Sequence, residues 1–297
     1  MLCTVNNKMA DRQHPHITWH KHSRFTMTDF LKNPVLVFDI ETVADIEGAR
    51  RVYPQLANLN DEDTLTALTS LRIQESGHDF MRLPLHKIVC ISVFYIKEGQ
   101  FSLFSLTAET LSEKEILSTF FRAFKDLNTL PQLVSWNGSG FDIPVLIYRA
   151  MLYDLSVPLL FEEGNRINSM RYDNYVNRYQ TRHLDLMDRF SQYGGSRREA
   201  MSIVANLYGL PGKRDIDGSQ VGDMVAQKQW QQLSIYCESD VLNTWLIYLR
   251  WMRLTGNISS ADFDMWQAET RDFLRNKLDE NDSVRHQDFL DYWSVSE

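Results

Sequence analysis

The sequence predicts an α/β fold, a mixed sheet with helices on its faces. Short apolar runs rich in β-branched residues cluster early in the chain, and further along such runs alternate with segments whose apolar residues recur at helical spacing. This order of elements is typical of a mixed sheet covered by helices. With 297 residues, 43% of them hydrophobic, the chain can bury a large core in one elaborated domain or two modest ones.

The first predicted strand covers residues 35–40, an apolar and β-branched run, and we expect it to end near Asp39. The stretch that follows, residues 44–84, is polar with helical spacing, and Asp61 could cap a helix within it. We therefore expect a helical insertion that could cover the side chains that the first strand exposes.

Two more strands are predicted at residues 88–96 and 101–106, because the Glu-Gly-Gln sequence at 98–100 is typical of a tight turn between antiparallel strands. A helix over 112–126 begins with a Ser-x-x-Glu capping box, and residues 133–136 form another buried strand. After these we expect a helix from Phe141 onward, a short strand at 183–187, and helices over 197–208 and 228–253.

The chain divides into three parts. Residues 1–30 lack apolar periodicity, so we expect a flexible N-terminal arm rather than a metal site, despite its histidines His14, His16, His20 and His22. Residues 31–256 hold the predicted sheet and its helices. Residues 257–297 are predicted to form a C-terminal helical extension of one or two helices, which could pack on the domain or meet a partner.

Composition limits the classes of function. The 31 Lys and Arg against 39 Asp and Glu give a net charge of −8, which argues against a general nucleic-acid coat and tight nonspecific duplex binding. A nuclease is not excluded, because divalent cations can neutralise a carboxylate cluster locally. The odd number of cysteines, Cys3, Cys90 and Cys237, indicates reduced thiols, and no apolar run has the length of a membrane span. We expect a cytoplasmic protein without a membrane partner.

Asp39 and Glu41 are the first candidate metal ligands. Since they lie two residues apart in a strand, their side chains project to the same face. The two carboxylates would repel each other unless a cation or hydrogen-bond donor compensates them. The alternative is a polar strand end in solvent, and Asp-x-Glu alone does not decide between the two.

Asp142 is the next candidate. It ends the sequence Asn137-Gly-Ser-Gly-Phe-Asp142, where a strand gives way to a helix and two glycines permit a sharp turn. The alternative is a capping role, because Asp before Ile143-Pro144 is typical of a helix N-cap.

The long predicted helix near the C-terminus carries Tyr236 and Asp240. A spacing of four puts the tyrosine and the aspartate on one helix face, where a hydroxyl and a carboxylate can meet one reacting group. Apolar residues surround much of this helix, so Asp240 should face inward and need a partner. Tyr236 alone could equally be a core aromatic with a satisfied hydroxyl.

Together these motifs resemble the DEDDy group of 3′-5′ exonucleases, because strand Asp-x-Glu, then Asn-x-x-x-Phe-Asp, then helical Tyr-x-x-x-Asp follow in this order. The likeness is strongest to the free-standing form of the proofreading-like exonuclease domain of family B DNA polymerases, and it runs from about residue 35 to 250. It includes the segments 183–187 and 215–221. Ile235 stands where histidine-type relatives carry their histidine, which favours the tyrosine type.

The resemblance implies a ribonuclease H-like fold for residues 31–256 and a site for two divalent cations, Mg²⁺ or Mn²⁺. Asp39, Glu41 and Asp240 would ligate one ion, with Asp39 also reaching the second ion and Asp142 holding it through water. Tyr236 would orient the attacking water or help to deprotonate it. The two cations would stabilise an in-line displacement at phosphorus.

Nucleic-acid contacts are expected in three places. Asn137 and Phe141 would touch the terminal nucleotides, although Phe141 could serve only as packing. Arg178 belongs to an arginine- and tyrosine-rich stretch that could guide a single strand or form a solvated hairpin; its arginines are Arg166, Arg171, Arg178 and Arg182. Lys213, with Arg214, could contact phosphate or belong to a plain surface loop. Asp185 and Asp188 are expected to be structural.

These observations predict an enzyme that hydrolyses single-stranded DNA from the 3′ end and releases nucleoside monophosphates, with a possible partner in repair or replication. The nearest alternative is an RNA-trimming enzyme like ribonuclease D, which a helical accessory domain would favour; the region after residue 257 is short for one. A catalytically silent nucleic-acid-binding scaffold is the other alternative.

Overall fold

A computed structural model describes residues 33–212 and 218–294. Its sheet has five strands in the order β3-β2-β1-β4-β5, with β1, β2 and β3 antiparallel and β4 and β5 parallel to β1. The strands are β1 (Val35–Ala44), β2 (His86–Lys97), β3 (Gln100–Thr107), β4 (Gln132–Ser135) and β5 (His183–Asp185). The predicted mixed sheet is confirmed.

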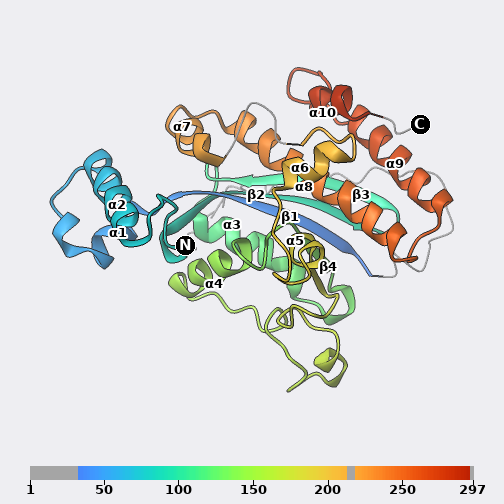
Figure 1. The fold of residues 1–297 in the computed structure, drawn as a ribbon, viewed down its shortest axis with the longest axis horizontal. Coiled ribbons are helices and arrows are strands. Elements are labelled where there is room, and N and C mark those ends of the chain that lie inside the picture. The colour runs from blue at the N-terminus through green and yellow to red at the C-terminus, as the bar shows by residue number, and fades with distance from the viewer. Residues whose placement is uncertain (1–32, 213–217, 295–297) are drawn as a thin grey trace, which may run out of the picture.

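Helices cover both faces of this sheet (Figure 1), as the α/β prediction required, and the arrangement is consistent with a ribonuclease H-like fold. They are α1 (Ile46–Val52), α2 (Asp61–Ser76), α3 (Glu113–Phe120), α4 (Asp142–Leu152), α5 (Leu186–Phe190), α6 (Met201–Leu207), α7 (Val221–Ala226), α8 (Trp230–Leu254), α9 (Ser260–Arg275) and α10 (Gln287–Tyr292). In the part of the chain that the structure describes, no helix is long and apolar enough to cross a membrane.

The side chains of β1 divide between two hydrophobic cores. Val35 and Val37 pack in the core beneath α8 and α9, whereas Leu36 and Phe38 pack in the core shared with α3 and α4. Alternation along a strand therefore places Asp39 and Glu41 on the α8 side of the sheet. Figure 1 shows α8 and α9 above the sheet and α3 and α4 below it.

β1 does not end near Asp39, as the sequence predicted, but continues to Ala44. The reason is β2, which pairs with β1 from Val35 to Ala44 around a register shift between Glu41 and Thr42. On its other edge, β1 pairs with β4 only as far as Val37. The stretch that carries Asp39 and Glu41 thus runs beyond β4, and that edge of the strand is open to other contacts.

Local chain chemistry explains most of the predicted boundaries. Glu98 and Gly99 both have positive φ, the backbone geometry of a two-residue antiparallel hairpin turn. Ser112 and Glu115 form the predicted capping box of α3. Besides the end of β1, several boundaries were wrong; the helix predicted over 197–208, for example, covers Met201–Leu207. Asn60, not Asp61, caps α2, and the strand predicted at 183–187 ends at Asp185, because the Asp185 side chain caps α5.

The predicted insertion is helical, and it extends to one side of the sheet as α1 and α2 (Figure 1). Buried Arg149 on α4 ties it to the domain. Its Nη1 donates to Asp45 at 2.5 Å, and its Nε donates to Glu113 at 2.7 Å. Arg149 is 3% exposed, so this cation compensates two carboxylates inside the fold.

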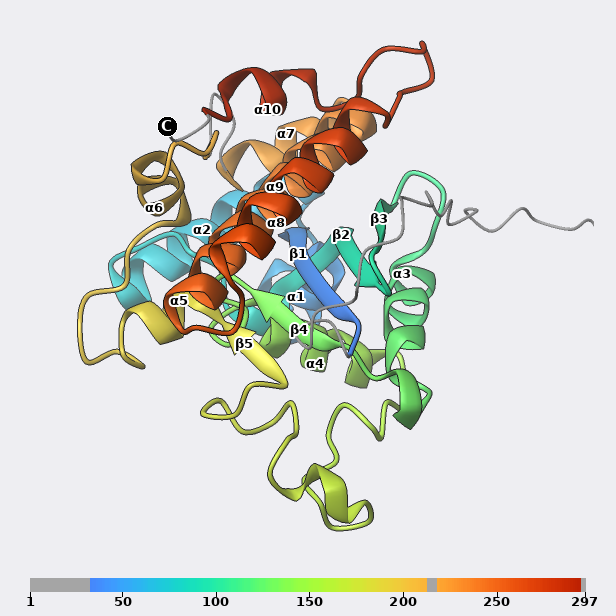
Figure 2. The same cartoon turned by 90° about the vertical axis from the view of Figure 1, so that its right-hand side faces the viewer.

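The residues after 257 pack on the sheet domain (Figure 2). From α9, Trp266 and Phe273 contact Phe101 of β3, with ring centroids 5.7 Å apart in both pairs. Buried Glu238 of α8 accepts hydrogen bonds from His286 and Arg285, both at 2.8 Å. Burial alone would raise the pKa of Glu238, but these two partners hold it well below its usual value. The segment before α10 is therefore fixed to α8 by an ion pair from Arg285 and a hydrogen bond from His286.

Replacing Arg149 by Met should lower the free energy of unfolding by about 3 to 5 kcal/mol, because Asp45 and Glu113 would remain buried without their cation. Burial acts to raise the pKa of Asp45, yet the hydrogen bond and charge of Arg149 keep it below 3.8. Such a depressed carboxyl stabilises the fold above its unfolded pKa and loses this effect as the pH falls. Urea titrations should therefore show that the difference in unfolding free energy between wild type and Arg149→Met becomes smaller below about pH 4.

The matched control is Arg122→Met, which removes an exposed arginine on the same side of the sheet. It should change the free energy of unfolding by no more than about 0.5 kcal/mol. Equal stability of the Arg149 and Arg122 variants at neutral pH would contradict this account of the insertion.

Candidate active site

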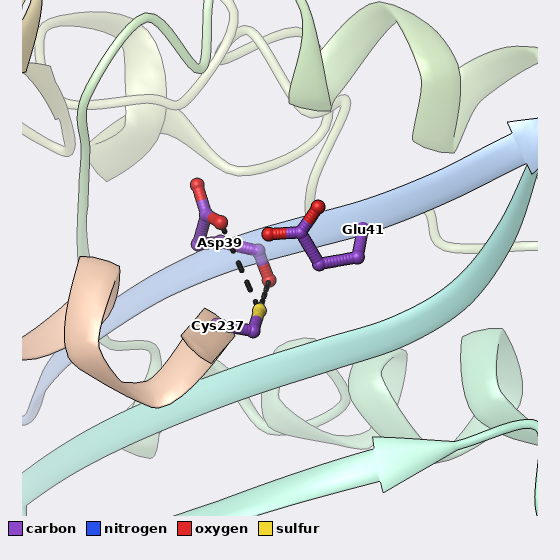
Figure 3. A group of neighbouring side chains, drawn as sticks. All are labelled: Asp39, Glu41 and Cys237. Atoms are coloured by element: carbon purple, nitrogen blue, oxygen red, sulfur yellow. Dashed lines mark hydrogen bonds between the residues drawn. The ribbon is translucent and has the colours of Figure 1, made fainter. Parts of the chain in front are cut away.

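Asp39 and Glu41 lie side by side on the α8 face of β1, where Figure 3 shows the Glu41 carboxylate turned toward Asp39. One carboxylate oxygen of Asp39, one of Glu41 and the sulfur of Cys237 in α8 all lie within 4.8 Å of one another. Among the described residues, these three form the group that could hold a metal ion. Glu41 is 7% exposed and Asp39 is half-buried, so the pair does not stand freely in solvent. Two adjacent carboxylates in this position favour a bound cation.

The sequence interpretation assigned no role at this site to Cys237, the residue after Tyr236. Its thiol lies 3.7 Å from Asp39 Oδ2 and 3.6 Å from the Asp39 carbonyl oxygen. Burial, the neighbouring Cys90, and the charges of Asp39 and Glu41 all raise the pKa of Cys237 well above its usual value. The thiol is therefore protonated and donates to Asp39. Cys90 and Cys237 are free and buried, as predicted.

Asp142 is the first residue of α4, and the N-cap position belongs to Phe141. The capping alternative for Asp142 was therefore wrong, because the turn before α4 starts the helix one residue earlier than a capping aspartate would require. Asp142 is 3% exposed, and its Oδ1 has no hydrogen-bond partner. Burial and the charge of Asp39 raise the pKa of Asp142 well above its usual value, while the Ile40 backbone N–H opposes this.

That contact with Ile40 explains how Asp142 reaches the site. β4 stops pairing with β1 at Val37, so the next open stretch of β1 is available to a side chain from the start of α4. The carboxylate of Asp142 occupies this position beside Asp39, with which it interacts electrostatically. Two candidates from distant segments are thus brought together.

The turn between β4 and α4 is held by Asp185, whose carboxylate accepts from the backbone N–H groups of Asn137 and Ser139 at 2.9 Å each. The structural role expected for Asp185 is thereby explained. Asn137 has a φ of 63°, and a Cβ at position 138 would come within 2.2 Å of Ser135 Oγ, so only glycine fits there. This turn fixes where Asp142 begins α4.

Phe141, expected to meet the terminal nucleotides, joins an aromatic cluster that the sequence did not reveal. Its ring centroid lies 5.0 Å from that of His86 and 5.9 Å from that of Phe80, which comes from the end of the insertion. Phe80 is 52% exposed. The insertion therefore places an exposed aromatic ring next to the residue that precedes Asp142, and Phe141 has a packing role whatever else it contacts.

Tyr236 and Asp240 lie one turn apart on α8, as their spacing predicted. Both are buried, at 6% and 2% exposure, and both line a cleft of about 630 Å³. The other wall of this cleft comes from the C-terminal segment 284–292. Asp240 is not in the close group of Asp39, Glu41 and Cys237, although it faces inward as expected.

The remaining nucleic-acid candidates differ in what surrounds them. Arg178 has a 40% exposed side chain and bonds to buried Asp188 at 2.6 Å. Residues 161–182 form loops and a short 3-10 helix, Asn168–Arg171, rather than a hairpin. Arg182 is paired with Asp173, and Arg166 with Glu162. Lys213 and Arg214, like the N-terminal arm, lie outside the described residues.

Chemically, this arrangement concentrates carboxylate oxygens where β1 and α4 meet, beside Cys237 of α8. A buried carboxylate oxygen without a hydrogen-bond partner, Asp142 Oδ1, is costly unless a ligand compensates it. Carboxylate oxygens suit hard divalent cations such as Mg²⁺ and Mn²⁺. The residues present therefore fit a divalent-cation site.

Comparison with known proteins agrees with this chemistry. Over residues 78–293 the chain matches a family described as "Predicted 3'-5' exonuclease related to the exonuclease domain of PolB". The matched region contains Asp142, Tyr236 and Asp240 and begins after Asp39 and Glu41. No curated protein matches the chain. Because the match covers well over half of its residues, the chain belongs to this family of 3′-5′ exonucleases, which are phosphodiester hydrolases.

Proposed function

We propose that this protein shortens single-stranded DNA from the 3′ end and releases nucleoside monophosphates, using two divalent cations held by Asp39, Glu41, Asp142 and Asp240. The observation that carries the proposal is Asp142, a buried carboxylate with one unpartnered oxygen, beside Asp39 on an open strand edge. Family membership supplies the reaction class, and the charge of these side chains supplies the reason for a metal.

The cations would be Mg²⁺ or Mn²⁺, since all four proposed ligands are carboxylates. When bound, such a pair supplies an acidified water and stabilises charge on the departing 3′ oxygen. Cys237 helps to orient one of these proposed ligands, because its protonated thiol donates to the Asp39 carboxylate.

Tyr236 would position the attacking water. It lies one helical turn before Asp240 and lines the same cleft as this proposed ligand. A phenol ordinarily titrates near pH 10, so at neutral pH its hydroxyl is better suited to orienting water than to removing the proton. Asn137 and Phe141, fixed by the Asp185-held turn, would contact the terminal nucleotides.

DNA rather than RNA is proposed from the resemblance to polymerase exonuclease domains. Substrate in single-stranded form agrees with the net charge of −8, which disfavours broad contact with a duplex. An RNA-trimming enzyme of ribonuclease D type would use the same chemistry, so digestion of DNA and RNA strands in parallel distinguishes the two.

Asp39→Ala should reduce Mn²⁺-dependent shortening of 5′-labelled single-stranded DNA by about a thousandfold, because it removes the carboxylate proposed to reach both ions. Gel analysis of digestion products measures this. Asp272→Asn is a suitable control, since Asp272 is exposed on α9 and should retain full activity.

A parallel digestion of RNA of the same sequence is part of this experiment. Faster shortening of RNA would replace the DNA proposal by the ribonuclease D alternative. Equal activity of wild type and Asp39→Ala would show that the site is wrong or that a contaminant cuts the strand.

Asp142→Asn should abolish activity but stabilise the metal-free protein by about 1 to 3 kcal/mol, because it removes a buried charge that burial and Asp39 destabilise. Thermal unfolding in EDTA measures the gain. Adding Mn²⁺ should raise the thermal midpoint of wild type, since a ligand bound to the folded state stabilises it. The difference in thermal midpoint between wild type and Asp142→Asn should therefore become smaller. A variant less stable than wild type in EDTA would oppose the role given to Asp142.

Tyr236→Phe should lower kcat by about 10- to 100-fold with little change in KM, because the ring still packs while the water-orienting hydroxyl is lost. The increase in thermal midpoint caused by Mn²⁺ should be retained. A KM effect alone, or loss of the Mn²⁺ response, would contradict the role given to the hydroxyl.

A further inference from the structure

A second cleft, of about 400 Å³, lies on the α4 side of the sheet and borders the turn that precedes Asp142. Ser139 and Gly140 of that turn line it. Arg178 and Arg198 line it as well. Leu133 of β4 and His183 of β5, which are partners in the parallel pair, also line the cleft.

The two arginines are brought together by one carboxylate. Asp188 accepts from Arg178 at 2.6 Å and from Arg198 at 3.1 Å. The Asp188 side chain is 4% exposed, whereas those of Arg178 and Arg198 are 40% and 46% exposed. Two guanidinium groups thus share one carboxylate at the cleft of an otherwise acidic chain. Sequence analysis did not identify Arg198, since only folding pairs it with Arg178.

Apolar side chains complete the cleft. Phe161 and Val176 line it and are 43% and 46% exposed, although both are large hydrophobic residues. Beyond the arginine pair, the Arg178 guanidinium lies 5.5 Å from the ring centroid of Tyr193, which stands edge-on to the 65% exposed Tyr179. Guanidinium groups alternating with accessible apolar and aromatic faces suit a chain of phosphates and bases.

We infer that this cleft holds the single strand upstream of its 3′ end, with a backbone phosphate bound by Arg178 and Arg198 and a base resting on Phe161 and Val176. The inference rests on the proposed function, because it takes the 3′ end to lie at Asp142. Asp188 is then a positioning residue: it keeps the two guanidinium groups converged on one point while they retain donors for a phosphate.

The test is the affinity of the full chain for a 5′-fluorescein-labelled dT strand of about 12 nucleotides, measured by anisotropy in EDTA at about 50 to 200 mM salt. Arg178→Ala and Arg198→Ala should each raise Kd about tenfold. Each should also reduce the slope of log affinity against log salt by about 0.7, the loss of one phosphate contact. Single variants are used because each leaves Asp188 one cation.

Two controls make the result specific. Arg122→Ala removes the same charge from an exposed site outside the cleft and should leave both Kd and the salt slope unchanged. Arg198→Lys keeps the charge without the planar fork and should recover part of the affinity, which a merely structural arginine would not predict. Circular dichroism confirms that each variant is folded.

The inference is overturned if Arg178→Ala and Arg198→Ala bind like Arg122→Ala, or if the wild-type chain does not bind the strand. The proposed function is tested separately, by Mn²⁺-dependent digestion, and does not depend on either result. Digestion by wild type together with unchanged binding in the cleft variants would place the strand elsewhere and leave the active site as proposed.

Discussion

Negative charge beside the open edge of β1 is the constraint around which this structure is arranged. Burial and the charge of Asp39 both disfavour the ionised form of Asp142. Elsewhere in the same interior, buried carboxylates meet cations, as Asp45 and Glu113 meet Arg149. The group at β1 differs in that Asp142 Oδ1 has no hydrogen-bond partner, which agrees with the cation proposed there.

Sheet geometry makes this arrangement possible, and it also marks how far sequence could predict the fold. Periodicity and turn chemistry correctly predicted the strands, the α3 capping box and α8. They did not predict that β1 continues to Ala44, because that extension depends on pairing with β2 rather than on its own residues. Nor could they show that the pairing of β1 with β4 stops at Val37, which leaves room for Asp142.

The parts of the candidate site that depend only on residue spacing along one strand or one helix could be predicted from the sequence. Alternation along a strand puts Asp39 beside Glu41, and a helical spacing of four puts Tyr236 beside Asp240. Contacts between distant segments were not accessible in this way. The approach of Cys237 to Asp39, the cluster of Phe80 with Phe141, and the sharing of Asp188 by two arginines all depend on tertiary packing, for which one sequence offers no periodic pattern.

The most direct measurement is an anomalous difference map from crystals of the full chain grown with Mn²⁺ and a short single-stranded oligonucleotide. The account predicts manganese peaks between the carboxylates of Asp39, Glu41, Asp142 and Asp240, with the 3′-terminal phosphodiester beside them. Manganese bound elsewhere, or a strand whose 3′ end lies away from these four side chains, would contradict it.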